Sequence, residues 1–358
     1  MNFTLFGYPK TGKTTLFNLL TGARIEVDTY TSGGKKEPNL RTCSVPDARL
    51  DKISQLYPEK SKKNAAIDYI DLAGVSFGEV KNEFYLNYLR KADGLTNVVR
   101  GFFDENIPHP KGRISPCEDI AAMEEELILT DLFSVESRLE KLDKELKRSK
   151  SLENEREKEL LDKLHSALEE GKALREMEFS STEDKLIRSF AFLSQKPLIH
   201  MINVDESDIP LINNPEKICE NRKSKVKILA FCGSVEMEIL ELEDEEKKLF
   251  FDEYGFEEPS VTRYLKASYD LLEVITFFSV GKDEVKAWTI KSGTSAIDAA
   301  GVIHTDIARG FIRAEVISYE ELISIGSFQA ARDSGAVRLD GKDYVVGDGD
   351  VIYFRFSK

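Results

Sequence analysis

The segment GYPKTGKTT, residues 7–15, fits the pattern G-x-x-x-x-G-K-[ST]. It follows the short apolar run Asn2–Phe6 and precedes the largely apolar run Thr15–Leu20, as a loop between a strand and a helix does. Backbone N–H groups of such a loop, together with the positive end of the helix, bind phosphates. We therefore predict a triphosphate-binding loop in which Lys13 contacts the β and γ phosphates and Thr14 binds Mg²⁺.

A second motif, DLAG at residues 71–74, ends the strand-like run Ala66–Asp71. The D-x-x-G pattern is weak alone, because many strands end in it by accident, but it is strong when it follows a phosphate loop. In that setting the aspartate holds a Mg²⁺-bound water and the glycine N–H contacts the γ phosphate. We assign these roles to Asp71 and Gly74.

A third motif follows the apolar run that begins at Pro197, and reads NVDE at residues 203–206. Guanine-specific GTPases carry N-K-x-D at this place, and the aspartate accepts two hydrogen bonds from guanine. The longer side chain of Glu206 displaces the carboxylate and leaves those donors badly paired, which favours adenine. A simple turn at a strand end explains the segment equally well when it is considered alone.

The apolar segments of the first 232 residues alternate with helical stretches. The expected strands lie at about 2–6, 66–71, 95–102, 197–203 and 226–232. This alternation predicts an α/β fold with a doubly wound, mostly parallel sheet, and it places all three motifs at the carboxyl ends of strands.

Between the third and fourth expected strands lies a long charged region with a heptad-like apolar pattern. Its apolar residues are Ile128, Leu132, Val135, Leu139, Leu142 and Leu146, and after a break at 149–151 a second set follows, Leu160, Leu161, Leu164 and Leu168. We predict an inserted antiparallel coiled-coil hairpin. It is either a spacer or a contact arm for RNA or protein.

The C-terminal part changes to short alternating strands around glycine-rich turns, as in Glu284–Ile290 and Val351–Phe356. A small β-grasp-like unit is expected here. His304 and Asp306 either cap a short helix or, with nearby arginines, touch RNA phosphates.

The bulk composition restricts the function classes. A chain of 358 residues is long enough for two or three packed units, and a net charge of −14 disfavours a generic nucleic-acid coat while leaving room for local basic patches. No secretion signal or membrane-length apolar stretch is present, so we expect a cytoplasmic protein without membrane or DNA partners. The cysteines lie far apart without a CxxC pair, which disfavours a disulfide scaffold or a zinc site; they are Cys43, Cys117, Cys219 and Cys232.

These motifs, with AWTIKSGTSAIDAAGVIHTDIARGFIRAEVISYEEL and KDYVVGDGDVIYFRF near the C-terminus, resemble the YchF/Obg-like ATPase family of the TRAFAC P-loop GTPase superfamily, over essentially the whole chain. The resemblance implies a P-loop (OBG-type G) domain at 1–274, interrupted by a helical coiled-coil insertion at 118–194, and a TGS domain at 275–358. It also implies a preference for ATP over GTP and association with ribosomes.

By that resemblance, Asn203, Val204 and Glu206 border the base, and the loop at 232–234 backs it. The full predicted nucleotide-binding set is Lys10, Thr11, Gly12, Lys13, Thr14, Thr15, Gly74, Asn203, Val204, Glu206, Cys232, Gly233 and Ser234, with Thr14 directly and Asp71 through water as the Mg²⁺ residues.

The chain departs from the family pattern at three places. Lys10 replaces an asparagine that helps to hold a monovalent cation in related GTPases, so its ammonium group either substitutes for that ion or is an ordinary surface lysine. Lys35 stands where a Mg²⁺-sensing threonine is expected, and Thr31 is nearby but out of register. Cys232 stands where serine is common, a mild change.

The residue after D-x-x-G is Val75, whereas Ras-like enzymes carry a glutamine that orients the attacking water. Intrinsic hydrolysis is therefore expected to be slow, and the catalytic group is unknown. It comes from elsewhere in the chain or from a partner, with His109 as a weak candidate against an ordinary loop histidine.

The leading hypothesis is a monomeric, ATP-hydrolysing molecular switch that binds the ribosome or ribosomal RNA and acts in translation or the stress response. One alternative is a GTP-specific GTPase on the same scaffold. Another is an adaptor that binds nucleotide without hydrolysing it.

Overall fold

The computed structural model describes residues 1–26, 37–74, 80, 82–109, 111–149, 151–220 and 225–357. The chain divides into two compact units. The larger unit comprises Asn2–Arg41 and Asp68–Leu271, and the smaller unit comprises Met1, Thr42–Ile67 and Leu272–Lys358. The segment 42–67, which the sequence analysis assigned to the nucleotide-binding domain, therefore groups with the C-terminal residues.

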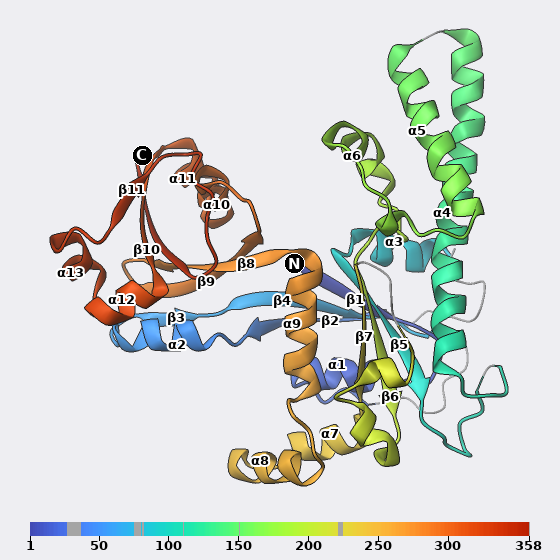
Figure 1. The fold of residues 1–358 in the computed structure, drawn as a ribbon, viewed down its shortest axis with the longest axis horizontal. Coiled ribbons are helices and arrows are strands. Elements are labelled where there is room, and N and C mark those ends of the chain that lie inside the picture. The colour runs from blue at the N-terminus through green and yellow to red at the C-terminus, as the bar shows by residue number, and fades with distance from the viewer. Residues whose placement is uncertain are drawn as a thin grey trace. The chain divides into compact units, whose positions relative to one another are not determined.

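The first sheet has the strand order β2-β4-β1-β5-β6-β7 (Figure 1). Its strands are β1 (Asn2–Phe6), β2 (Asn39–Val45), β4 (Ala65–Asp71), β5 (Gly94–Gly101), β6 (Leu198–Val204) and β7 (Val226–Phe231). The pairs β1 with β4, β1 with β5, β5 with β6, and β6 with β7 are parallel, which confirms the predicted doubly wound sheet. Strand β2 was not predicted, because most of its side chains are polar and exposed.

Helices of the larger unit cover this sheet or extend from it. They are α1 (Lys13–Thr21), α3 (Glu83–Lys91), α4 (Pro116–Arg148), α5 (Leu152–Glu169), η1 (Leu174–Glu176), α6 (Ser181–Ile187), η2 (Arg188–Phe190), η3 (Glu206–Leu211), η4 (Pro215–Lys217), α7 (Gly233–Leu240), α8 (Asp244–Glu253) and α9 (Ser260–Leu272). In the core, the ring of Tyr264 on α9 lies 5.8 Å from that of Phe3, and its hydroxyl lies 2.6 Å from Thr96 Oγ1. This contact joins α9 to two neighbouring parallel strands.

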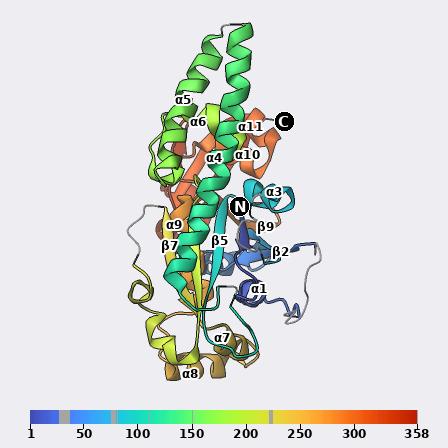
Figure 2. The same ribbon diagram turned by 90° about the vertical axis from the view of Figure 1, so that its right-hand side faces the viewer.

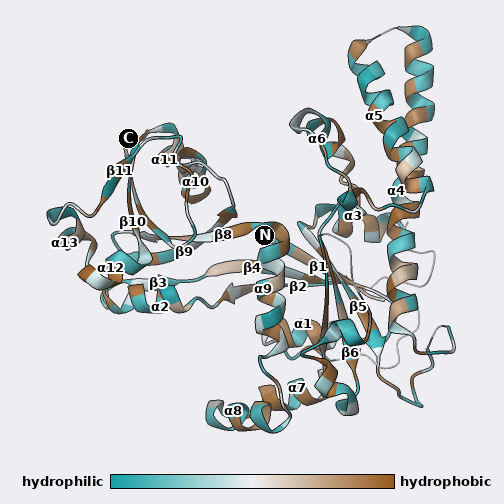
Figure 3. Cartoon of the chain, in the orientation of Figure 1, coloured by the Kyte–Doolittle hydropathy of each residue, from teal (hydrophilic) through white to brown (hydrophobic). Residues whose placement is uncertain are grey.

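The predicted hairpin is present as α4 and α5, which run side by side (Figures 1 and 2). The buried seam contains Ile128, Val135, Leu142, Leu160, Leu161, Leu164 and Leu168, with Leu132 and Leu139 partly buried against it. Figure 3 shows hydrophobic and hydrophilic stretches alternating along both helices. Arg138 adds a two-pronged ion pair with Glu157, with both N–O distances at 2.8 Å. The coiled-coil interpretation is thus confirmed.

The smaller unit holds a second sheet with the order β11-β10-β12-β8-β9-β3. Its strands are β3 (Ser61–Lys63), β8 (Val274–Val280), β9 (Glu284–Lys291), β10 (Phe311–Ser318), β11 (Arg338–Asp340) and β12 (Asp350–Phe356), and its helices are α2 (Ala48–Gln55), α10 (Ala296–Ile303), α11 (Thr305–Arg309), α12 (Tyr319–Ile325) and α13 (Phe328–Asp333). The predicted β-rich C-terminal unit is confirmed. Two elements of the 42–67 segment complete it, since β3 pairs with β9 and α2 packs on the same core.

His304 caps the N-terminus of α11, where its Nδ1 accepts a hydrogen bond from the Asp306 N–H at 3.2 Å. This confirms the helix-capping alternative for His304. In the described part of the chain, no helix combines the length and apolar character needed to cross a bilayer.

Candidate functional site

Glycines shape the loop between β1 and α1 and its contacts with the other two motifs. Gly12 has φ of 96° and begins the helix, and a Cβ at this position would collide with the Asn203 amide. A Cβ on Gly7 would collide with the Val98 carbonyl, and one on Gly74 with the backbone of Pro9. The loop therefore lies directly against both other motifs, with its backbone groups at the start of α1.

Lys13 is buried in this loop, with 6% of its surface exposed. Its Nζ donates a hydrogen bond to the Tyr8 carbonyl at 2.7 Å. Burial lowers the pKa of Lys13 to about 8, and the charge of Asp71 partly opposes that shift. A desolvated ammonium group held by one neutral carbonyl is suited to bind an anion that enters the loop.

Asp71 connects the second motif to the loop. Its Oδ2 accepts hydrogen bonds from Thr14 Oγ1 at 2.9 Å and from Asn39 Nδ2 at 3.1 Å. A hydroxyl and a carboxylate side by side form an oxygen donor set of the kind that Mg²⁺ takes together with water and phosphate oxygens. Asn39, which directly follows Pro38, was missing from the predicted set of site residues.

Asn203 joins the phosphate loop to the loop at 232–234. Its Nδ2 donates to the Thr11 carbonyl at 3.2 Å, and its Oδ1 accepts from the Gly233 N–H at 3.0 Å. A Cβ on Gly233 would press against Thr15 at 3.0 Å and against Asn203. Three segments that are distant in sequence thus meet around one buried amide.

The remaining base-site residues differ in exposure. Val204 is buried in an apolar cluster, so that only its backbone can border a ligand. Glu206 is exposed at the start of η3, and its carboxylate raises the pKa of the Tyr254 hydroxyl. Cys232 is buried, with its sulfur 3.4 Å from the hydroxyl of the exposed Ser234. Tyr254 is a neighbour of the base loop that no motif indicated.

Lys10 is exposed and has a left-handed backbone with φ of 60°. The positions Thr31, Lys35 and Val75, on which the switch and catalysis hypotheses rest, lie outside the described residues. Gly74 is described, and its carbonyl accepts a hydrogen bond from the Tyr85 hydroxyl at 3.3 Å.

His109 is tied to the beginning of α4. Its Nε2 lies 2.9 Å from Asp119 Oδ2, and its Nδ1 accepts from the Lys111 N–H at 3.2 Å. Only 4% of the imidazole is exposed. Because one ring nitrogen lies beside a carboxylate and the other accepts a backbone N–H, this arrangement is the one expected of a structural loop histidine.

A buried polar chain runs from the sheet to the base of the hairpin. Asn97 Nδ2 lies 3.1 Å from His200 Nδ1, and His200 Nε2 lies 3.2 Å from Glu124 Oε1. The second Glu124 oxygen lies 3.6 Å from Arg175 Nη1. Asp131, about two turns further along α4 from Glu124, accepts hydrogen bonds from two backbone N–H groups, and burial raises its pKa to about 6.

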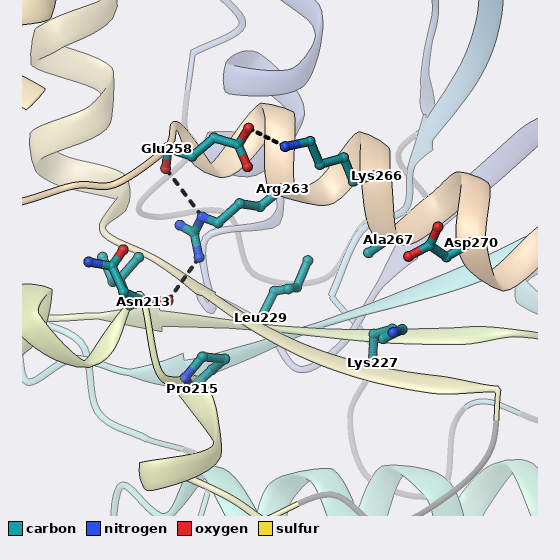
Figure 4. A pocket seen from close by; sticks show the side chains of 10 residues that line it. Asn213, Pro215, Lys227, Leu229, Glu258, Arg263, Lys266, Ala267 and Asp270 are labelled. Atoms are coloured by element: carbon teal, nitrogen blue, oxygen red, sulfur yellow. Dashed lines mark hydrogen bonds and ion pairs between the residues drawn. The ribbon is translucent and has the colours of Figure 1, made fainter. Parts of the chain in front are cut away.

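A pocket of about 250 Å³ opens between β7 and α9 (Figure 4). Arg263 lies in it, but the guanidinium donates to the carbonyls of Glu258, Ile212 and Ala230. Lys266 is likewise paired with Glu258 at 2.6 Å. These cations hold the surrounding segments together, and the phosphate loop does not line this pocket.

Two family models match the chain. Residues 2–156 match MMR_HSR1, described as a 50S ribosome-binding GTPase, and residues 274–357 match YchF-GTPase_C, described as a protein of unknown function (DUF933).

Relatives cover nearly the whole chain. The ribosome-binding ATPase YchF of Bacillus subtilis is 39% identical over 99% of this chain and 98% of its own length. Obg-like ATPase 1 of Oryza sativa subsp. japonica is 32% identical over 99% of this chain and 91% of its own length. Among solved structures, the YchF GTPase of Schizosaccharomyces pombe gives a TM-score of 0.84 at 27% identity, with 99% of this chain and 97% of that chain covered.

Proposed function

The chain belongs to the YchF family, and from that premise we propose that it is an ATP-hydrolysing molecular switch that associates with the ribosome and acts in translation or the stress response. It is a nucleoside triphosphatase with a P-loop domain, as its relatives are. The cytoplasm is the compartment in which such a switch meets ribosomes.

The arrangement around Asn203 carries this assignment. The amide holds the phosphate loop on one side and the loop at 232–234 on the other, so a purine nucleotide can bridge them with its phosphates at Lys13. Glu206 follows on the same strand end, where guanine readers carry an aspartate. We assign the nucleotide to the predicted set of residues, from Lys10 to Ser234, on this basis.

Mg²⁺ fits the site, because Thr14 Oγ1 and Asp71 Oδ2 are oxygen ligands 2.9 Å apart beside the phosphate loop. When bound, the ion neutralises charge on the β and γ phosphates. Thr14 would ligate it directly and Asp71 through water. The domain limits 1–274, with the insertion at 118–194, and 275–358 stay part of the proposal, since the described units divide the chain differently at 42–67.

The catalytic group is not assigned. Val75 has no group that orients water, and His109 reaches the site only if it leaves Asp119. A group supplied in trans by a partner raises the rate of nucleotide hydrolysis by about 10³–10⁵-fold. Such a dependence suits a switch that hydrolyses its nucleotide when it binds its target.

Ribosome pelleting tests the switch. Purified protein is centrifuged through sucrose with Bacillus subtilis ribosomes in ATP, in ADP and without nucleotide, each with Mg²⁺. We expect the bound fraction to change with nucleotide by an affinity ratio of about tenfold, or about 1.4 kcal/mol of coupling. Equal binding in all three conditions would contradict a switch, and no binding in any of them would contradict the ribosome as partner.

Exchanging Glu206 for aspartate tests the base assignment. Glu206→Asp is expected to shift the ratio of GTP to ATP affinity towards GTP by about tenfold, because the shorter carboxylate returns to the position that pairs with guanine. Calorimetric titration with both nucleotides measures the ratio. Glu216→Asp is the matched control, because Glu216 is an exposed glutamate in the segment that follows Glu206. If wild-type protein bound GTP tenfold more tightly than ATP, the adenine assignment would be wrong.

A further inference from the structure

Two cysteines that are far apart in the sequence lie next to each other in the larger unit. Cys117 is the second residue of α4, and Cys219 follows η4. The Cys117 thiol donates a hydrogen bond to the carbonyl of Ile218, the residue before Cys219, at a sulfur–oxygen distance of 3.1 Å. The fold thus brings together a pair whose spacing in the sequence gave no indication of a disulfide.

The two thiols have different environments. Cys117 is exposed, whereas Cys219 is buried in an apolar cluster with Ile120 of α4 and Ile212. Burial, followed by the neighbouring Cys117 side chain and the charge of Glu124, raises the pKa of the Cys219 thiol to about 12. An oxidant therefore meets Cys117 first, with Cys219 protected behind it.

Hydrogen bonds hold the segment that carries Cys219 in place. Arg263 donates to the Ile212 carbonyl at 2.9 Å, and Asn213 donates to the Gly255 carbonyl at 3.0 Å. The Cys219 N–H closes a turn onto the Pro215 carbonyl at 3.1 Å. Because both the turn and the helix end are fixed, the thiols stay near each other and ring closure requires little loss of chain entropy.

We propose that Cys117 and Cys219 are a redox modification site, which forms a reversible intramolecular disulfide when the protein meets a hydroperoxide. The Cys117 sulfur attacks the peroxide, breaks the O–O bond and becomes a sulfenic acid, with water or an alcohol leaving. The Cys219 sulfur then attacks the sulfenic sulfur, loses its proton and releases water. Two thiols are oxidised by two electrons while one peroxide is reduced.

Packing alone does not explain the pair. A cysteine that serves only as a small apolar residue is buried, as Cys219 and Cys232 are, but Cys117 is exposed at a helix end. The bond would link the root of the α4–α5 hairpin to the segment that follows Glu206. Its formation does not depend on the proposed function, because it requires neither nucleotide nor ribosome.

Peptide mapping of the full-length protein tests the site. Reduced protein is treated with equimolar hydrogen peroxide, free thiols are blocked by an alkylating agent, and the protein is digested without reductant for mass spectrometry. We expect a linked peptide pair containing Cys117 and Cys219, lighter by two hydrogens than the sum of the two peptides. Dithiothreitol added before the block should return both thiols to the alkylated form.

Cysteine variants identify the two residues that form the disulfide. Cys117→Ser and Cys219→Ala are each expected to abolish the linked pair, and Cys43→Ser, in the smaller unit, should leave it unchanged. If Cys219→Ala does not fold, the peptide map of the wild-type protein still shows whether Cys117 and Cys219 are linked. Recovery of Cys117 as sulfinic acid while Cys219 remains fully alkylated would overturn the proposal, as would a link that joins Cys117 to another cysteine.

Discussion

Lys13→Ala is expected to reduce ATP hydrolysis by about 10²–10³-fold, the loss typical when one preorganised donor to a developing charge is removed. Lys13 is the buried cation of the phosphate loop, and among the described residues its ammonium is held by the Tyr8 carbonyl and by the nearby charge of Asp71. A triphosphate is a far better partner for this group than a neutral carbonyl. Phosphate release with Mg²⁺ measures the effect.

Lys91→Ala serves as control, because this exposed lysine belongs to the same unit and lies at the end of α3. Two outcomes would change the interpretation. Phosphate release that is equal in Lys13→Ala and wild-type protein would come from a contaminant or another site. Wild-type protein that binds ATP without any release would support the adaptor alternative.

The same lysine makes ATP binding depend on pH, with a sign that follows from its pKa. In the free protein burial lowers the pKa to about 8, whereas a bound triphosphate favours the charged form and raises it. Below pH 8 the lysine is already charged and binding takes up no proton. Above pH 8 binding must take up a proton, so the affinity is expected to fall by up to about tenfold per pH unit. Calorimetry in two buffers of different ionisation enthalpy measures the proton uptake, and an affinity that stays constant from about pH 8 to about pH 9.5 would contradict the assignment.

Much of the larger unit could be predicted because parallel strands buried on both faces are apolar runs in sequence. The strands at 2–6, 65–71, 94–101, 198–204 and 226–231 were predicted to within about one residue. The hairpin was equally visible, since its seam repeats over several turns. The grouping of segment 42–67 with the smaller unit was not predicted, because β2 and β3 expose most of their side chains and lack apolar alternation.

The site was predictable where function requires a fixed spacing along the chain, as in the phosphate loop. It was not predictable where partners come from separate elements. Asn39 and Tyr254 belong to no motif, yet one binds Asp71 and the other lies beside Glu206. His200 occupies an apolar strand and its partner Glu124 a long charged helix, so neither sequence pattern indicates their contact.

Glu124→Ala is expected to destabilise the larger unit by about 3–5 kcal/mol, the usual cost of removing one member of a buried ion pair. Glu124 is 5% exposed, and it faces His200 through one oxygen and Arg175 through the other. Burial already lowers the pKa of Arg175, while Glu124 opposes that shift. Without the carboxylate, the guanidinium keeps the charges of Asp131 and Glu176 and the Lys196 carbonyl, and His200 loses its partner on α4.

The chain provides its own controls for this measurement. Glu125 is the next residue of α4 and is exposed, so Glu125→Ala is expected to change stability by less than about 0.5 kcal/mol. The single tryptophan, Trp288, lies on β9 in the smaller unit, and its fluorescence reports unfolding there. In urea, the far-ultraviolet circular dichroism, to which the long helices α4 and α5 contribute strongly, should therefore begin to fall earlier in Glu124→Ala, while the Trp288 transition stays where it is in the wild type. Equal movement of both transitions would show that the two units unfold together, and no movement of either would show that Glu124 is not needed to keep Arg175 buried.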